Sequence, residues 1–311
     1  MNSARVPGTY RLIKSSLGAV VLAGTLLATG IAPASADAAG EHYVALGDSF
    51  ASGPLVPDIT GPLACGRSTH NYPHELAARL HVASFKDVTC SGAATKHTTE
   101  PQSGSVLGLP TGTEPPQFDA LGPDTTLVTL TFGGNDAGLV GVAQDCMTLD
   151  PGAKPCKDRF AAQVDQRIEE FKPRIAAVLD GIHARSPKAR VVATGYGDYI
   201  RPGGCFPLQP VLGVDADFLQ GSVDRLNAAV AEAAAAHGAD YADVRTPSKG
   251  HDSCAAPGDR WIEGYVPVHL AAPLHPNRQG EESYARIIGD QLQLQLQSQS
   301  QSQSQLQLQK G

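Results

Sequence analysis

Short apolar runs alternate with longer amphipathic stretches along most of this chain. Five runs rich in apolar or β-branched residues predict strands, at 43–46, 84–89, 127–131, 190–194 and 240–244. Apolar residues spaced three and four positions apart predict helices over 158–185 and 215–237, and we expect shorter helices over 73–81 and 279–289. Because strands alternate with helices, the pattern predicts a parallel sheet covered on both faces, a three-layer α/β domain.

Proline and glycine mark where this pattern is interrupted. Pro173 lies inside the helix predicted over 158–185, and we expect it to kink or divide that helix because proline lacks a backbone N–H. The Gly- and Pro-rich stretches at 101–124 and 201–214 are typical of surface loops rather than of linkers between domains. We therefore expect one globular domain over residues 37–290.

The first 36 residues have the three parts of a secretory signal peptide. They contain basic residues and no acidic one, then an apolar stretch over 17–32 and the small-residue site Ala34-Ser35-Ala36. A membrane anchor is the alternative, but the apolar stretch is shorter than a spanning helix needs. We expect cleavage after Ala36, export of the protein, and no stable insertion into a membrane.

Residues 291–311 form a tail of low complexity. Over 291–309, glutamine alternates with leucine or serine almost without interruption. This composition favours a disordered tail, with a prolonged last helix or association through β-structure as alternatives. We expect truncation after Asp290 to leave the activity of the body unchanged.

Charge and composition exclude two broad classes of protein. The chain carries 24 Lys and Arg against 31 Asp and Glu, a formal net charge of −7, so binding of nucleic acid through a basic face is not expected. A hydrophobic content of 41% is too high for a chain that is disordered throughout.

Six cysteines in an exported chain predict structural disulfides. A zinc site is the alternative, but the chain has no C-x-x-C pair and its cysteines are dispersed. The spacing alone does not select one pairing from those that are possible. The six are Cys65, Cys90, Cys146, Cys156, Cys205 and Cys254.

Four short polar blocks follow one another along the chain, three of them directly after predicted strands. Because ligands bind outside the carboxyl ends of parallel strands, we expect these three blocks at one edge of the sheet. Each block is common on its own, whereas the ordered set of four is not. The blocks are Gly47-Asp48-Ser49-Phe50, Ser91-Gly92-Ala93, Gly133-Gly134-Asn135-Asp136 and Leu274-His275-Pro276-Asn277.

The residue types in these blocks fit acyl transfer. Ser49 is the candidate nucleophile, and His275 is the candidate base that takes its proton and later protonates a leaving alcohol. The N–H groups of Ser49 and Gly92 and the side-chain amide of Asn135 can supply three donors to an oxyanion. The glycine motifs of nucleotide-binding proteins, the G-x-S-x-G motif and the H-E-x-x-H motif are missing from the sequence, so we expect no cofactor and no metal.

Together the four blocks resemble those of the SGNH (GDSL-type) hydrolases, and the chain is most similar to the secreted lipases and esterases of actinomycetes. The resemblance implies a flavodoxin-like α/β/α sandwich and a serine esterase. It implies that Ser49 is the nucleophile, Gly92 and Asn135 are oxyanion donors, and His275 is the base. It also implies sequential disulfides, which here would be Cys65–Cys90, Cys146–Cys156 and Cys205–Cys254.

One position departs from the family pattern. The family usually has an aspartate three residues before the catalytic histidine, and this chain has Ala272 there. The resemblance to the actinomycete enzymes implies a main-chain carbonyl in its place, and we expect the Ala272 C=O to orient the imidazole. Asp48 and Asp136 adjoin the motif residues, and we expect each to order its own turn through side-chain-to-backbone hydrogen bonds.

These observations lead to a definite functional expectation. We expect a secreted, metal-independent carboxylic-ester hydrolase that acts as a monomer on lipids or other fatty-acyl esters. A carbohydrate deacetylase of the acetylxylan type is the alternative within the same family. A secreted binding protein that keeps the fold is the non-enzymatic alternative, and it would have to explain why nucleophile, base and oxyanion residues are all present.

Overall fold

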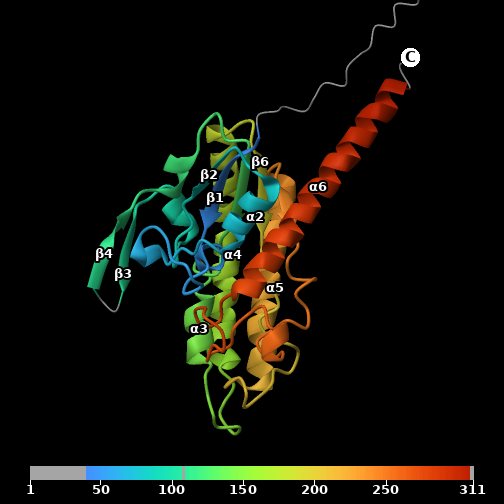
Figure 1. Ribbon diagram of the computed structural model, residues 1–311. Coiled ribbons are helices and arrows are strands. Elements are labelled where there is room, and N and C mark those ends of the chain that lie inside the picture. Colours follow the sequence, from blue (N-terminus) through green and yellow to red (C-terminus); the bar gives the residue numbers. More distant parts are fainter. Residues whose placement is uncertain (1–39, 107–108, 309–311) are drawn as a thin grey trace, which may run out of the picture. The chain divides into compact units, whose positions relative to one another are not determined.

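The centre of the fold is a parallel sheet of five strands (Figure 1). The computed structural model describes residues 40–106 and 109–308, so the predicted signal peptide lies outside the described residues. The order across the sheet is β2-β1-β5-β6-β7, which confirms the predicted parallel α/β architecture. The strands are β1 His42–Gly47, β2 Ser84–Asp87, β5 Leu127–Thr131, β6 Arg190–Thr194 and β7 Asp240–Ala242.

Helices cover both faces of this sheet. Helix α2 (Tyr72–Leu80) packs against α6 (Arg278–Leu308), and α4 (Lys157–Arg185) packs against α5 (Gly213–Ala236). Figure 1 shows the two pairs on opposite sides of the strands. Every residue of β5 is buried, as expected of a strand that lies between two layers of helices.

The strand order places a crevice next to β1. The chain leaves β1 for β2 on one side, and β5 pairs with β1 on the other side. At such a point the connections diverge to opposite faces and leave an opening outside the carboxyl ends of the two strands. Ser49 follows β1 and Asn135 follows β5, so two of the predicted blocks lie beside this opening.

Helix α4 is not divided at Pro173. Both halves bury residues on one face, among them Ile168 and Phe171 before the proline and Ile175 and Leu179 after it. Burial of this continuous stripe outweighs the cost of a proline inside a helix, about 3 kcal/mol for the lost hydrogen bond and the steric clash together. The predicted division of this helix was therefore wrong.

Part of the stretch predicted as loop at 101–124 is a hairpin. Strands β3 (Gln102–Val106) and β4 (Leu109–Glu114) pair antiparallel in a separate small sheet. Glycines and a proline interrupt these strands, so no apolar alternation indicated them. Two short helices also follow strands, α1 (Ser49–Ser52) after β1 and α3 (Leu139–Asp145) after β5.

The Gln-rich tail continues helix α6 as far as Leu308. The expectation of disorder from residue 291 was wrong, and the alternative of a prolonged last helix holds, because glutamine and leucine are both good helix formers. The first turn of this segment packs on the body: Leu292 is buried, its carbonyl accepts from Arg190 at 3.2 Å, and Gln291 donates to the Tyr241 carbonyl at 2.7 Å. No helix within the described ranges is long and apolar enough to cross a membrane.

Truncation at two neighbouring positions should therefore have different effects on stability. A chain ending at Asp290 loses Leu292, whose burial contributes about 2–3 kcal/mol, so its melting temperature should fall by several degrees. A chain ending at Leu294 keeps every one of these contacts and should melt with the full-length protein. Thermal denaturation followed by circular dichroism measures both. Equal melting temperatures for the two truncations would show that Leu292 contributes nothing.

Candidate active site

Ser49 lies at a sharp turn between β1 and α1. Asp48 caps the helix, accepting a hydrogen bond from the Phe50 N–H at 2.9 Å. Gly47 has φ 147°, and a Cβ there would lie 2.9 Å from the Thr131 carbonyl oxygen, so only glycine fits. The turn brings the Ser49 side chain to the wall of a pocket at the end of the sheet.

His275 contacts Ser49 across 226 residues of sequence. The distance from His275 Nε2 to Ser49 Oγ is 2.7 Å, and His275 Nδ1 lies 2.7 Å from the Pro273 carbonyl oxygen. A carbonyl can only accept, so Nδ1 carries the proton and Nε2 is left to accept the Ser49 hydroxyl proton. Burial lowers the pKa of His275, and its hydrogen bond to Pro273 only partly opposes this shift, so the ring is neutral at pH 7.

The orienting carbonyl is that of Pro273 and not, as expected, that of Ala272. The Ala272 carbonyl accepts instead from the backbone N–H of His275 at 3.2 Å. Leu274, which lies between Pro273 and His275, has φ 62°. This left-handed residue turns the chain so that the Pro273 carbonyl faces the imidazole. The orienting carbonyl therefore lies one residue later than expected because of the backbone conformation of this turn.

A buried glutamate that the sequence analysis missed holds this loop in place. The Glu263 side chain is fully buried, and its backbone N–H donates to the His275 carbonyl at 2.9 Å. Burial would raise the pKa of Glu263, but hydrogen bonds from the Asn277 side chain (2.8 Å), the Val268 N–H (2.8 Å) and His269 (2.7 Å) outweigh it and keep the pKa below its usual value. No motif indicates Glu263; only its burial does.

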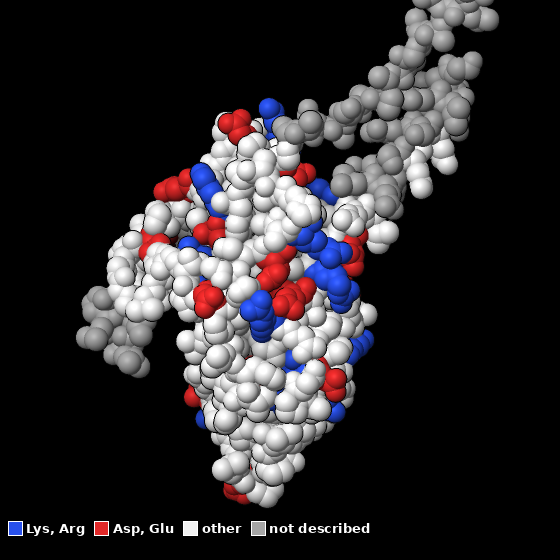
Figure 2. Space-filling view, in the orientation of Figure 1, with Lys and Arg blue, Asp and Glu red and all other residues white. Residues whose placement is uncertain are grey.

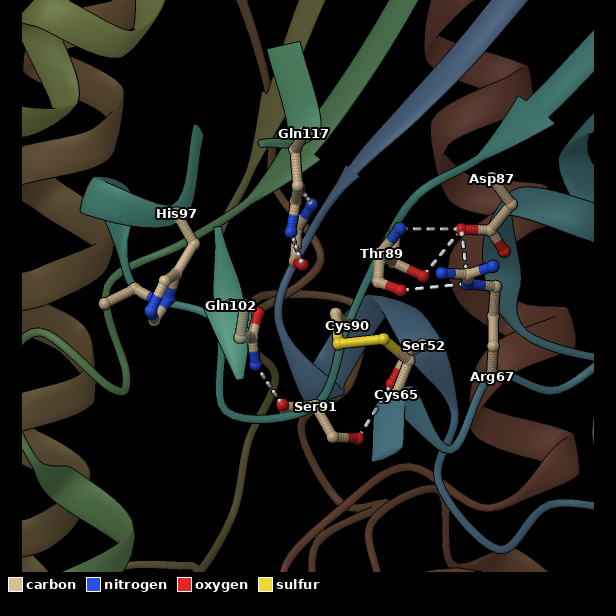
Figure 3. Close-up of a disulfide and its surroundings, with 12 residues drawn as sticks. Ser52, Cys65, Arg67, Asp87, Thr89, Cys90, Ser91, His97, Gln102 and Gln117 are labelled. Carbon is tan, nitrogen blue, oxygen red and sulfur yellow. Dashed lines mark hydrogen bonds and ion pairs between the residues drawn. A yellow bond between two sulfur atoms is a disulfide. The ribbon is translucent and has the colours of Figure 1, made fainter. Parts of the chain in front are cut away.

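The turn that carries Gly92 is fixed from three sides (Figure 3). Cys90 forms a disulfide with Cys65, and the Ser91 N–H donates to the Cys65 carbonyl at 3.1 Å. Gln102 of β3 donates to the Ser91 carbonyl at 2.8 Å, and the hydroxyls of Ser91 and Ser52 lie 3.1 Å apart. Gly92 itself has φ 79° and is exposed, beside the pocket rather than in its wall.

Asn135 and Asp136 connect the third block to the second. The Asn135 side-chain amide uses one of its two N–H groups to donate to the Ala93 carbonyl at 2.9 Å, and Asn135 lines the pocket. Asp136 accepts from the Thr95 N–H at 3.0 Å and from the Thr95 hydroxyl at 2.5 Å. Asp136 therefore orders the loop after β2, and the expectation that it orders its own turn was wrong.

Asp48 behaves as expected within its turn but also reaches across the sheet. Its second carboxylate oxygen accepts from the Tyr196 hydroxyl at 2.6 Å, and that hydroxyl accepts from the Gly134 N–H at 2.7 Å. Burial raises the pKa of Asp48 to about 7, against the opposing effect of the bonds from Tyr196 and Phe50.

The pocket beside Ser49 and His275 is lined mainly by apolar side chains. Its volume is about 780 Å³, including the open mouth. Ser49, Asn135 and His275 lie together in its wall, so three of the four predicted site residues share one cavity. The apolar part of the wall comes from α3, α5 and the loops after β6 and before α6; it includes Leu139, Tyr199, Ile200, Val211, Leu219, Val223, Tyr265 and Leu274.

Each of the three disulfides joins one cysteine to the next cysteine along the chain. The pairs are Cys65–Cys90, Cys146–Cys156 and Cys205–Cys254, which is the pairing that the resemblance implies. The second closes the loop between α3 and α4, and the third connects the loop before α5 to the segment after β7. Among the described residues, no group of three or more His, Cys, Asp and Glu side chains is arranged to hold a metal ion.

The raised pKa of Asp48 has a measurable effect on stability. The folded state holds this proton more tightly than the unfolded state, whose aspartates titrate near about 3.9, so stability falls as the pH rises from about 4 through 7. Asp48→Asn keeps the acceptor for the Phe50 N–H, replaces the oxygen that accepts from Tyr196 with an amide NH2, and cannot ionise. We expect a smaller loss of melting temperature between pH 5 and pH 8 in this variant, without complete loss of the effect, because burial also raises the pKa of Asp198 and Glu281. If the melting temperature of Asp48→Asn falls between pH 5 and pH 8 as much as that of the wild type, the raised pKa is not that of Asp48.

Comparison with known proteins gives consistent results. Residues 45–282 match the GDSL-like Lipase/Acylhydrolase family. The chain is 40% identical over 303 residues to Lipase 2 of Streptomyces coelicolor, covering 92% of this chain and 98% of that protein, and 31% identical to a lipase of Streptomyces rimosus, covering 77% and 82%.

Solved structures agree with the sequence comparison. The fold is similar to that of phospholipase A1 from Streptomyces albidoflavus NA297, with a TM-score of 0.68 and 29% identity. It is equally similar to the extracellular lipase from Streptomyces rimosus, with a TM-score of 0.67 and 29% identity; both alignments cover 81% of this chain and 99% of the other. The chain therefore belongs to the GDSL-like lipase/acylhydrolase family and is a carboxylic-ester hydrolase.

Proposed function

We propose that this protein is a secreted serine hydrolase that cleaves fatty-acyl esters through an acyl-enzyme on Ser49. The observation that carries the proposal is the 2.7 Å contact between Ser49 Oγ and His275 Nε2 in the wall of an apolar pocket. A nucleophile in hydrogen-bond contact with a neutral base has the geometry that acyl transfer requires.

Acylation begins when His275 Nε2 takes the Ser49 proton as Oγ attacks the ester carbonyl carbon. The carbonyl π electrons move to oxygen and give a tetrahedral oxyanion, and the imidazole becomes an imidazolium. When the intermediate collapses, the bond to the alkoxy oxygen breaks, and His275 gives its proton to the leaving alcohol. The acyl group then remains on Ser49 Oγ.

Deacylation repeats the sequence with water as the nucleophile. His275 Nε2 takes a proton from water as its oxygen attacks the acyl carbon, and a second tetrahedral intermediate forms. Collapse breaks the bond to Ser49 Oγ, which receives the proton from His275 and is restored, and the carboxylic acid leaves.

The oxyanion has three candidate donors: the N–H groups of Ser49 and Gly92 and the second side-chain N–H of Asn135. A hydrogen bond from Asn135 to the Ala93 carbonyl and one from Gln102 to the Ser91 carbonyl hold the Asn135 amide and the Gly92 turn in place before any substrate binds. No free energy is then needed to order these donors in the transition state. His275 is oriented by the Pro273 carbonyl alone, so the unit is a dyad with a backbone helper. A carbonyl fixes the tautomer but stabilises an imidazolium less than a carboxylate would.

The pocket supports fatty-acyl chains as the acyl group. Its walls are mainly Leu, Val, Ile and Tyr side chains, which suit an apolar acyl chain better than an acetyl group. The relatives named above are lipases and a phospholipase A1. These observations favour a lipase or esterase over a deacetylase of polysaccharides. Secretion is supported by the three disulfides, which form in oxidising compartments, together with the features of residues 1–36.

The test is hydrolysis of p-nitrophenyl esters from acetyl to palmitoyl in the presence of EDTA. Ser49→Ala should lower kcat/KM by at least about 10³-fold, while Ser103→Ala, an exposed serine on the hairpin, should match the wild type. The wild type should prefer chains longer than acetyl. Equal activity in Ser49→Ala would exclude Ser49 as nucleophile, and a preference for acetyl esters together with release of acetate from acetylated xylan would favour the deacetylase.

The pH dependence of kcat/KM tests the base. Because burial lowers the pKa of His275 below the ordinary value of about 6.5, kcat/KM should rise with pH to a plateau, with its midpoint below 6.5. Asp48 titrates near pH 7 beside the same serine, so the profile of Asp48→Asn is the control and should keep the acid limb. A midpoint near 7 that disappears in Asp48→Asn would assign the limb to Asp48 instead.

A further inference from the structure

Large apolar side chains are exposed almost entirely at the end of the domain where the pocket opens. Of the twelve such side chains among the residues whose exposure the structure describes, eleven lie on segments that follow the carboxyl ends of sheet strands. Leu294 on α6 is the exception. Three of the eleven, Leu149 (75% exposed), Leu208 (64%) and Val266 (76%), are here called the apolar rim.

The three segments of the apolar rim are held side by side. The Thr148 N–H donates to the Pro210 carbonyl at 2.8 Å, which joins the segment of Leu149 to that of Leu208. The Tyr265 N–H donates to the Gln209 side chain at 3.0 Å, which joins the segments of Leu208 and Val266. The disulfides Cys146–Cys156 and Cys205–Cys254 fix two of these segments further.

The apolar rim adjoins the wall of the acyl pocket. Tyr265, next to Val266, lines that pocket, and its hydroxyl donates to the Ala143 carbonyl of α3 at 2.9 Å. Val211 lines it as well, three residues from Leu208. Val140 both lines the pocket and is 38% exposed, so apolar surface runs from the cavity to the outside.

Charge is unevenly distributed over the surface. In Figure 2, acidic and basic side chains lie mainly over the half of the view that holds the strands, α2 and the body of α6. The half that carries α3 and the loops beside it shows fewer of them, and these are of both signs: exposed Asp150 directly follows Leu149, and Lys154 is exposed on the same loop. Sparse charges of mixed sign give no strong field to attract an anionic or a cationic partner.

We propose that the apolar rim binds the surface of uncharged lipid and so places the pocket mouth against it. The inference rests on the proposed function, because an acyl chain that passes from a lipid layer into the pocket crosses least water when the mouth touches that layer. A neutral or zwitterionic lipid surface matches a rim whose side chains are apolar and whose few neighbouring charges are of both signs. The contact is peripheral: it buries side chains of loops and inserts no helix.

The test is sedimentation with sucrose-loaded vesicles of phosphatidylcholine, using Ser49→Ala so that no lipid is consumed. In this background, the triple variant Leu149→Ser, Leu208→Ser, Val266→Ser should lower the partition coefficient by at least about tenfold. Leu294→Ser removes a leucine of similar exposure (65%) from α6 and should bind within about twofold of its parent. Binding of the parent should persist in 1 M NaCl, because salt screens charges and not apolar contacts.

A second experiment distinguishes loss of lipid binding from misfolding and from loss of the hydrolytic reaction. With Ser49 intact, the triple variant should hydrolyse soluble p-nitrophenyl butyrate within about twofold of the wild type and lose activity only on esters held in vesicles. Vesicle binding by the triple variant equal to that of its parent would overturn the proposal. So would a dimer in sedimentation velocity that the triple variant abolishes while no protein binds vesicles, since the rim would then join two copies. Wild-type protein that binds vesicles through the rim but cleaves no soluble ester would refute the proposed function and leave the docking result standing.

Discussion

The site depends on a hydrogen-bonded bridge that joins the ends of three strands. The Asp48 carboxyl follows β1, the Tyr196 hydroxyl follows β6, and the Gly134 N–H follows β5. Asp48 and Tyr196 are buried, so leaving either without its partner would be costly. It fixes the turn of Ser49 relative to the turn of Asn135, and a nucleophile and an oxyanion donor must keep that relation throughout acyl transfer.

Much of the fold and most of the site could be predicted from the sequence, because both leave local patterns. The strands at 127–131 and 190–194 have the predicted bounds, since a buried parallel strand is a continuous apolar run. The strands at 84–89 and 240–244 each end two residues early, and after β2 the Asp87 carboxylate binds the N–H and hydroxyl of Thr89. Ser49 and Asn135 lie in one pocket wall because strands of a parallel sheet end at one edge, and the loop before α6 brings His275 to the same wall.

What could not be predicted depends on contacts between distant residues. The Pro273 carbonyl rather than the Ala272 carbonyl faces the imidazole because Leu274 has a left-handed backbone conformation. Leucine rarely adopts this conformation, so the sequence gives no indication of it. Glu263 looks like any acidic residue until its burial is known, and Asp136 meets Thr95 only in the folded chain. The continuation of α6 beyond residue 290 was expected only as an alternative to disorder, because period-two patterning obscured a composition that favours helix.

The pairing of the cysteines affects how the chain reaches its native disulfides. Each disulfide joins consecutive cysteines, with separations of 25, 10 and 49 residues, so no loop encloses an unpaired cysteine. If the chain emerges unfolded from its N-terminus, each cysteine pair is complete before the next begins to appear. Oxidation in order of emergence then gives the native pairing directly, without the slow thiol–disulfide exchange that interleaved pairings require.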